Sequence, residues 1–259
     1  MYTEITDVSK GFEELIDNIV QINTSARGQK SFFYDSDCAD RLEIICQNAK
    51  AITSLCKLDF QFFNSAKIIC RAMFEASVRV GWILNTDSKL EKENRWLAFV
   101  KNASKSIGER QKEILLIEPE TSFRQDELAE IENIINVVSE NINSQNPRIK
   151  LLNGIPNFKQ MLEESDAGFM YLLYRELSDE THASHLISGL YSTEYGLNEG
   201  GKVVQWWHVY SLMWFSLLFG PVSYLREKLN DEDILHSESQ LLQLHIKSVR
   251  ELADKLLKA

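Results

Sequence analysis

The longest uncharged stretch of the sequence, Val203 to Leu225, restricts the fold most strongly, because it contains no Asp, Glu, Lys or Arg. A helix needs about 20 apolar residues to cross a bilayer, so this stretch has the length of a membrane span. The interior Pro221 and several polar residues oppose insertion, namely Gln205, His208, Ser211, Ser216 and Ser223. We therefore expect a buried core helix and no contact with a membrane.

Glycine and proline are scarce, with 11 and 4 residues in a chain of 259. So few turn formers favour long helices, and apolar residues recur at helical spacing. We expect an all-α fold, in which a single domain over residues 1–259 holds about eight helices, with an internal connection at 144–157. The predicted helices cover 3–23, 37–58, 59–85, 88–117, 122–143, a short segment from 158, 166–185, 202–228 and a segment from about 230 onward. The two most apolar ranges, 59–85 and 202–228, are expected at the centre.

Charge and cysteine content limit the compartment and the partners. The formal net charge is −10, so most of the surface repels nucleic-acid phosphates, and RNA binding requires a local basic site. The N-terminal residues have no basic and apolar segments of a secretory signal, and we expect a cytoplasmic protein. Four cysteines form no C-x-x-C pair and are predicted to be buried, reduced thiols: Cys38, Cys46, Cys56 and Cys70.

The apolar range 59–85 is interrupted by three charged residues. Arg71, Glu75 and Arg79 are spaced four residues apart, so they share one face of the helix. If the three side chains form a buried ion network, removing one of them costs roughly 3–5 kcal/mol. Two arginines beside one carboxylate also suit the wall of an anion-binding pocket, and both interpretations remain open here.

A second polar group follows later in the chain. Arg175, Ser178 and His182 lie three and seven residues apart on one helical face, one turn after Tyr171 and Tyr174. Arginine holds phosphate charge, and histidine moves protons at neutral pH. We expect His182 to take the proton of a ribose 2′-hydroxyl while Arg175 stabilises the charge that develops on the scissile phosphate. Ser178 is predicted as a third catalytic residue, and Tyr171 and Tyr174 are predicted as binding residues. Such a reaction needs no metal and no cofactor.

Taken together, the two charged helices resemble a bacterial all-helical family catalogued as a domain of unknown function. Its members pair an R-x3-E helix with a late L-S-x3-H helix. Arg71 and Glu75 match the first motif, and Leu177, Ser178 and His182 match the second. The resemblance covers about residues 51–191 and implies the helical fold without implying an activity.

More distantly, the R-x6-H spacing of Arg175 and His182 is similar to the R-x4–6-H signature of the HEPN superfamily, named for higher eukaryotes and prokaryotes nucleotide binding. Those proteins are helical, often dimeric, and frequently metal-independent ribonucleases in toxin and phage-defence systems. The resemblance implies an endoribonuclease that acts on RNA as a homodimer. It also implies a protein partner, either an antitoxin or another component of a defence system.

Two other functions fit the same residues. The first is a non-enzymatic helical interaction or scaffold protein, in which Arg71, Glu75 and Arg79 and the pair Arg175 and His182 form buried structural networks. A di-metal helical bundle is the third interpretation, because two D-x-x-H pairs and two lone carboxylates are available: Asp179–His182, Asp233–His236, Glu43 and Glu75. Exposure of Arg175 and His182 in a cleft favours the ribonuclease, whereas burial of both favours the scaffold.

Overall fold

The computed structural model describes residues 2–26, 32–58, 62–117, 125–172, 174–175, 178 and 199–231. This part of the chain contains helices and no strand, which confirms the predicted all-α fold. The elements are α1 (Tyr2–Ala26), α2 (Phe33–Leu58), α3 (Phe63–Leu84), α4 (Lys89–Ile117), α5 (Gln125–Gln145), α6 (Phe158–Glu164), the 3₁₀ turn η2 (Gly168–Met170), α9 (Glu199–Leu217), the π-helical turn η3 (Leu218–Val222) and α10 (Ser223–Asp231).

The last three elements follow one another without a break, as the predicted range 202–228 suggests. Counting them as one rod gives seven helices in the described residues, where the sequence predicts about eight. The helix predicted from about residue 230 falls almost entirely outside the described residues.

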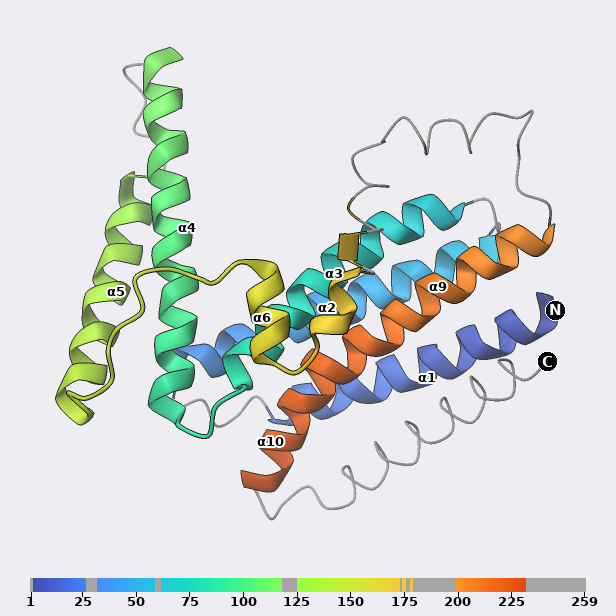
Figure 1. The fold of residues 1–259 in the computed structure, drawn as a ribbon, viewed down its shortest axis with the longest axis horizontal. Helices are drawn as coiled ribbons and strands as arrows, with labels where there is room; N and C mark the ends of the chain where they lie inside the picture. The colour runs from blue at the N-terminus through green and yellow to red at the C-terminus, as the bar shows by residue number, and fades with distance from the viewer. Residues whose placement is uncertain are drawn as a thin grey trace.

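Four helices, α1, α2, α3 and α9, lie side by side as a bundle (Figure 1). Within it α3 packs against both α2 and α9, so the two most apolar predicted helices are in contact. The core of α2, α3 and α9 contains large side chains that are almost fully buried: Leu42, Ile45, Ile52, Met73, Phe74, Ile83, Trp206 and Tyr210. α1 completes the core by packing on α2 with Leu15, Ile16 and Ile19 buried, and its Phe12 ring stacks on Tyr210 of α9 with centroids 5.4 Å apart.

Pro221 explains why the rod of α9 and α10 widens into a π-helical turn. Proline has no N–H to donate to the carbonyl four residues earlier, and its ring crowds that carbonyl. The turn lies directly against α3, where Ser77 Oγ donates a hydrogen bond of 2.6 Å to the Ser216 carbonyl. Gly220 allows this approach, because a Cβ at that position would lie 3.0 Å from the Ser77 backbone.

α2 begins at Phe33, four residues before the predicted start at 37. The reason is a carboxylate from a distant helix: Glu93 of α4 accepts the backbone N–H of Phe33 at 3.0 Å and that of Tyr34 at 2.9 Å. These donors at a helix N-terminus have no partner within their own helix. Glu93 therefore caps α2 and joins it to α4, a contact that no local pattern predicts.

A buried carboxylate in the first turn of α2 also fixes the end of α10. Asp35 accepts a hydrogen bond of 2.9 Å from the Tyr224 hydroxyl and forms an ion pair of 2.6 Å with Lys228. A neighbouring ion pair joins Lys92 of α4 to Glu227 of α10 at 2.7 Å. The ends of α2, α4 and α10 are thus tied together by charged groups.

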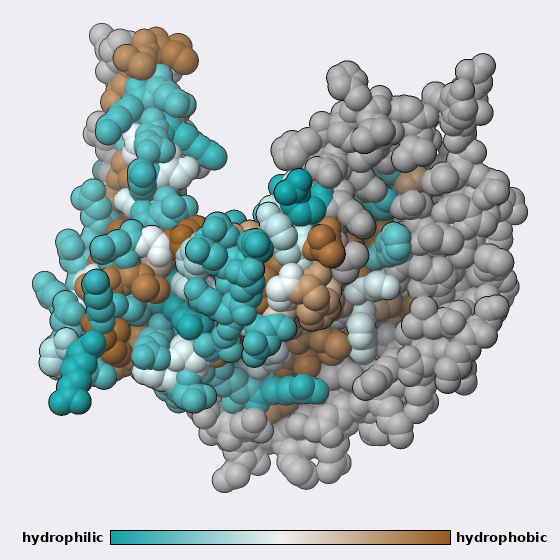
Figure 2. Space-filling model, in the orientation of Figure 1, coloured by the Kyte–Doolittle hydropathy of each residue, from teal (hydrophilic) through white to brown (hydrophobic). Residues whose placement is uncertain are grey.

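α4 and α5 form an arm that projects from the bundle (Figure 1). Val138 and Ile142 of α5 are buried in the contact with α4. Near the free end of the arm, Leu116 and Ile117 are 86% and 81% exposed, and Figure 2 shows hydrophobic surface there. The connection from Asn146 to Asn157 then leads back toward α3, at the position where the sequence predicts a connection over 144–157.

α6 begins as its sequence predicts, because Asn157 and Gln160 form a reciprocal capping box of two 3.0 Å hydrogen bonds.

All four cysteines are buried and unpaired, as predicted, and burial raises the pKa of Cys46 to about 12. In the described ranges, no helix combines the length and the apolar character that a membrane crossing requires.

Candidate functional site

The two helical segments that carry the predicted site residues meet on the surface of α3. Tyr174 packs over Phe158 of α6, with ring centroids 4.1 Å apart, and reaches Phe74 of α3 at 6.3 Å. On its other side, the Tyr174 ring lies 5.5 Å from the guanidinium of Arg71. The structure therefore brings together Arg71 and Tyr174, which the sequence predicts as binding residues more than a hundred positions apart.

Glu75 holds the guanidinium of Arg71 in place. Arg71 Nε donates to Glu75 Oε1 at 3.0 Å, and the two side chains are 19% and 29% exposed. Burial alone lowers the pKa of Arg71, but hydrogen bonds to Glu75 and Tyr174 outweigh it and raise that pKa. The pair is therefore a partly exposed ion pair rather than a buried one, and Arg71 stays charged at the surface.

Arg79 does not complete a three-residue ladder with Arg71 and Glu75. Its guanidinium lies 5.8 Å from the Phe99 ring of α4, and within the described residues it has no ion pair. Burial lowers the pKa of Arg79, and the nearby Arg41 of α2 lowers it further. The charged face of α3 is thus divided between two surroundings, one beside Tyr174 and one facing α2 and α4.

Residues of α2 also contribute to this face, which the sequence pattern alone does not reveal. Asp37 and Arg41 form an ion pair of 2.6 Å, and both act on the charge of Arg79. Their four-residue spacing is visible in the sequence, but such pairs are common on exposed helix faces. Only the packing of α2 on α3 places this pair beside Arg79.

Arg175 and Ser178 lie in the last described part of the predicted helix 166–185. Arg175 is exposed and Ser178 is partly buried, whereas His182 lies outside the described residues. Tyr171 is partly buried and contacts Tyr174 with ring centroids 6.0 Å apart, and the Lys159 amine lies 6.0 Å from its ring.

These residues form one surface, which we name the Arg71–Tyr174 surface and define as Arg71, Phe158, Lys159, Tyr171, Tyr174 and Arg175. It combines three cations with three aromatic rings, and cation–ring contacts join Arg71 to Tyr174 and Lys159 to Tyr171. Arg71 and Lys159 also form ion pairs with Glu75 and Glu163. Cations attract phosphate groups, and the three rings, which are partly exposed, offer faces on which nucleobases stack. On an acidic chain, this is a local site of the kind that binding a nucleic acid requires.

The fold and this surface define an all-helical protein with a cationic and aromatic face on α3. The chain belongs to a family of unknown function (DUF5677), whose model matches residues 42–195. The matched range contains both motifs that carry the predicted resemblance to an uncharacterised helical family, Arg71-x3-Glu75 and Leu177-Ser178-x3-His182. No curated protein and no solved structure matches the chain.

The described part of the structure contains only two of the residues in the di-metal hypothesis. Glu43 lies on α2 and Glu75 on α3, and the pairs Asp179–His182 and Asp233–His236 lie outside the described residues. Among the residues that are described, no three His, Cys, Asp or Glu side chains gather as metal ligands.

Proposed function

We propose that this protein is a metal-independent endoribonuclease of the HEPN type, acting on RNA as a toxin or a phage-defence effector in the cytoplasm. The observation that carries the proposal is the exposure of Arg175 as part of the Arg71–Tyr174 surface. A buried Arg175 would have favoured a structural Arg–His network. An exposed arginine beside stacking rings instead suits a strand of RNA passing over α3.

The proposed chemistry is internal transfer. His182 removes the proton from a ribose 2′-hydroxyl, and the 2′-oxygen attacks the adjacent phosphorus. The bond from phosphorus to the 5′-oxygen breaks, that oxygen takes up a proton, and a 2′,3′-cyclic phosphate remains. Arg175 stabilises the charge on the phosphoryl oxygens, and Ser178 lies on the same helical face to donate a further hydrogen bond.

Binding is assigned to the surface that leads to this helix. Tyr171 and Tyr174 stack nucleobases, and Arg71, held by Glu75, attracts a neighbouring phosphate. Arg175 and His182 are seven positions apart in the sequence, which in the predicted helix 166–185 corresponds to about 10 Å along the axis. We propose that the site is completed across a homodimer interface, where a second copy of the motif shortens this gap, and that a partner protein of the same defence system controls it.

The test compares cleavage of total RNA by the wild type, His182→Ala and Arg175→Ala, each with and without EDTA. The wild type should leave 2′,3′-cyclic phosphate ends in both conditions, and a DNA of the same sequence should stay intact because it lacks the 2′-hydroxyl. His182→Ala should abolish cleavage without changing the melting temperature by more than a few degrees. Arg110→Ala, which removes an exposed arginine of α4, is the matched control and should cleave normally.

Three results would contradict the proposal. An inactive wild type at micromolar protein argues for an interaction protein. Cleavage that persists in both variants places the activity elsewhere. Cleavage lost with EDTA favours the metal hypothesis and directs mutagenesis to Asp179 and Asp233.

A role as an interaction protein is the second candidate, and the free end of the α4–α5 arm favours it. Leu116 and Ile117 are among the most exposed large apolar side chains in the described residues. Exposed apolar groups on a projecting element are typical of protein contacts. Leu116→Glu should then abolish association with a co-encoded partner in pull-down experiments, whereas Lys105→Glu on the same helix should not.

A further inference from the structure

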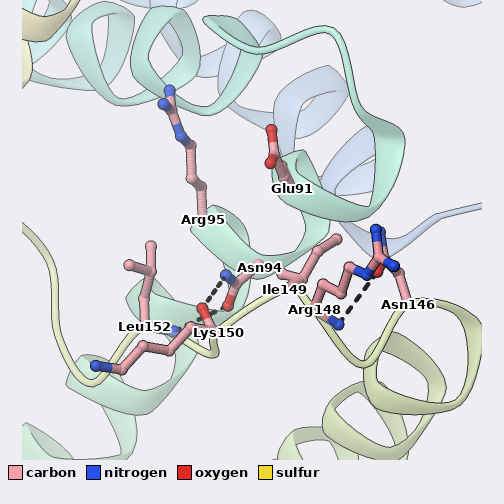
Figure 3. Close-up of a pocket in the computed structure, with 8 residues that line it drawn as sticks. All are labelled: Glu91, Asn94, Arg95, Asn146, Arg148, Ile149, Lys150 and Leu152. Carbon is pink, nitrogen blue, oxygen red and sulfur yellow. Dashed lines mark hydrogen bonds between the residues drawn. The ribbon is translucent and has the colours of Figure 1, made fainter.

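A pocket of about 420 Å³ lies between the start of α4 and the connection that follows α5 (Figure 3). Its wall consists of Glu91, Asn94, Arg95, Asn146, Arg148, Ile149, Lys150 and Leu152. None of these residues belongs to the Arg71–Tyr174 surface. The volume falls within the range of sites that hold small organic ligands, which is about 300–1,000 Å³.

One buried side chain fixes the shape of the pocket. Asn94, which is 5% exposed, donates from Nδ2 to the Lys150 carbonyl at 3.0 Å and accepts from the Leu152 N–H at 3.0 Å. These two bonds hold the connection against α4, in the way that backbone hydrogen bonds join neighbouring strands. A third bond of 3.2 Å, from the Arg148 N–H to Asn146 Oδ1, shapes the turn before the connection. The pocket is therefore formed before any ligand binds.

Positively charged side chains outnumber negatively charged ones in the wall of the pocket. Arg95, Arg148 and Lys150 contribute three cations, against the single carboxylate of Glu91. Arg148 and Lys150 are exposed, and within the described residues neither side chain forms an ion pair. On a chain with a formal net charge of −10, a pocket with a cationic excess is a local exception that attracts anions.

Contacts with Trp82 hold the side chain of Arg95 in place. Its guanidinium donates to the Trp82 carbonyl and lies 5.0 Å from the Trp82 ring centroid. The same indole donates from Nε1 to Glu164 at 2.6 Å, so a chain of contacts connects the pocket to α3 and α6. A cation with a fixed position loses little conformational entropy when it meets an anion.

Glu91 adds a second kind of recognition. One of its carboxylate oxygens, Oε2, accepts from the Thr86 hydroxyl, and within the described residues Oε1 has no partner. In Figure 3 this carboxylate lies between the side chains of Arg95 and Arg148. A carboxylate repels a bare anion but accepts hydrogen bonds from sugar hydroxyls. Ile149 and Leu152 supply apolar wall for a ring.

We propose that this pocket binds a mononucleotide or a closely similar small organic phosphate. Arg148 contacts the phosphate, Glu91 accepts a hydrogen bond from a ribose hydroxyl, and the base or sugar rests on Ile149 and Leu152. Lys150, whose side chain extends toward the opposite end of the pocket, adds to the positive potential that attracts the anion. The combination of free cations, one free carboxylate oxygen and an apolar wall distinguishes this ligand from inorganic phosphate, which uses only the cations. The inference is independent of the proposed ribonuclease activity, because it concerns different residues.

Isothermal titration calorimetry on the full chain tests the proposal, with AMP, adenosine and inorganic phosphate as probes. AMP should bind with a dissociation constant below about 1 mM, and adenosine and phosphate should each bind at least about tenfold more weakly. The double variant Arg148→Gln/Lys150→Gln should weaken AMP binding at least about tenfold. Lys105→Gln/Arg110→Gln, which removes the same charge from an exposed part of α4, should leave it unchanged.

Glu91→Gln separates a nucleotide site from a simple anion site. It should weaken AMP binding and leave phosphate binding equal or stronger, because it removes both the hydroxyl acceptor and the repulsion. AMP and phosphate binding with equal affinity would overturn the nucleotide assignment, as would no AMP binding below about 1 mM. A 5′-phosphorylated RNA that binds at least tenfold tighter than AMP, and loses this in the double variant, would overturn it in favour of an RNA end.

Discussion

Replacing Gly220 by alanine tests how closely the π-helical turn η3 must approach α3. A Cβ built on Gly220 lies 2.8 Å from Ser77 Oγ and 3.0 Å from both the Cα and the carbonyl oxygen of Ser77. The hydroxyl can rotate away, but the two backbone atoms belong to a buried helix and cannot move alone. η3 must therefore shift away from α3 and strain the hydrogen bond from Ser77 to Ser216.

Overpacking of this kind costs about 1–3 kcal/mol. For a chain of this size each kcal/mol corresponds to about 2–4 °C in melting temperature, so a decrease of about 2–12 °C is expected. Chemical denaturation followed by circular dichroism measures the free energy of unfolding, and a thermal scan measures the melting temperature. The loss should appear as a shift in the denaturation midpoint with an unchanged slope.

Gly108→Ala in α4 is the matched control, because a Cβ there meets nothing within 4 Å. Alanine is favoured over glycine inside a helix by about 1 kcal/mol, so this variant should be slightly stabilised. Equal stabilisation of both variants would refute the close contact between η3 and α3. The difference between the two variants therefore isolates packing from helix propensity.

Three further substitutions test other contacts of the bundle. Ser77→Ala removes the bond to the Ser216 carbonyl and should cost about 0.5–1.5 kcal/mol in denaturant unfolding, whereas Ser54→Ala, which removes an exposed bond within α2, should cost nothing measurable. Burial raises the pKa of Glu93, although the hydrogen bonds from the Tyr34 and Phe33 N–H groups oppose this shift. The folded state therefore binds a proton on Glu93 more tightly than the unfolded state does, and the stability of the fold falls as pH rises through that pKa. Glu93→Gln should reduce this loss when unfolding free energies are compared from about pH 4.5 to 7, and an unchanged pH profile would contradict the reasoning. Glu75→Ala should cost only about 1 kcal/mol, because the Arg71–Glu75 pair is partly exposed, and a loss above 3 kcal/mol would restore the buried network expected from the sequence.

Most of the helices were predictable because their signals are local. The apolar pattern over 59–85 predicts the buried α3, and the uncharged run from Val203 predicts a core helix that continues past Pro221. Asn157 and Gln160 are a capping pattern readable from four residues. The start of α2 was predicted four residues late, since the group that caps it, Glu93, belongs to another helix.

The candidate site was predictable only in part. The four-residue spacing of Arg71 and Glu75 predicts their ion pair, but the same spacing also suggests one with Arg79, which packs on Phe99 instead. Periodicity says which residues share a face and not which helix covers it. The pocket beside Asn94 illustrates the same limit, because nothing in the sequence connects that residue to the 146–152 segment.

The contact between Ser77 and Gly220 has a consequence for how this sequence can change during evolution. Position 77 must stay small while a glycine-proline pair turns the later helix toward it, and position 220 must stay small while Ser77 lies opposite. A chain that replaces Pro221 by an ordinary helix former regains a regular helix, and the constraint on both positions disappears together. Homologous chains should therefore show correlated substitutions at 77, 220 and 221, with a bulky residue at 77 only where the proline is absent.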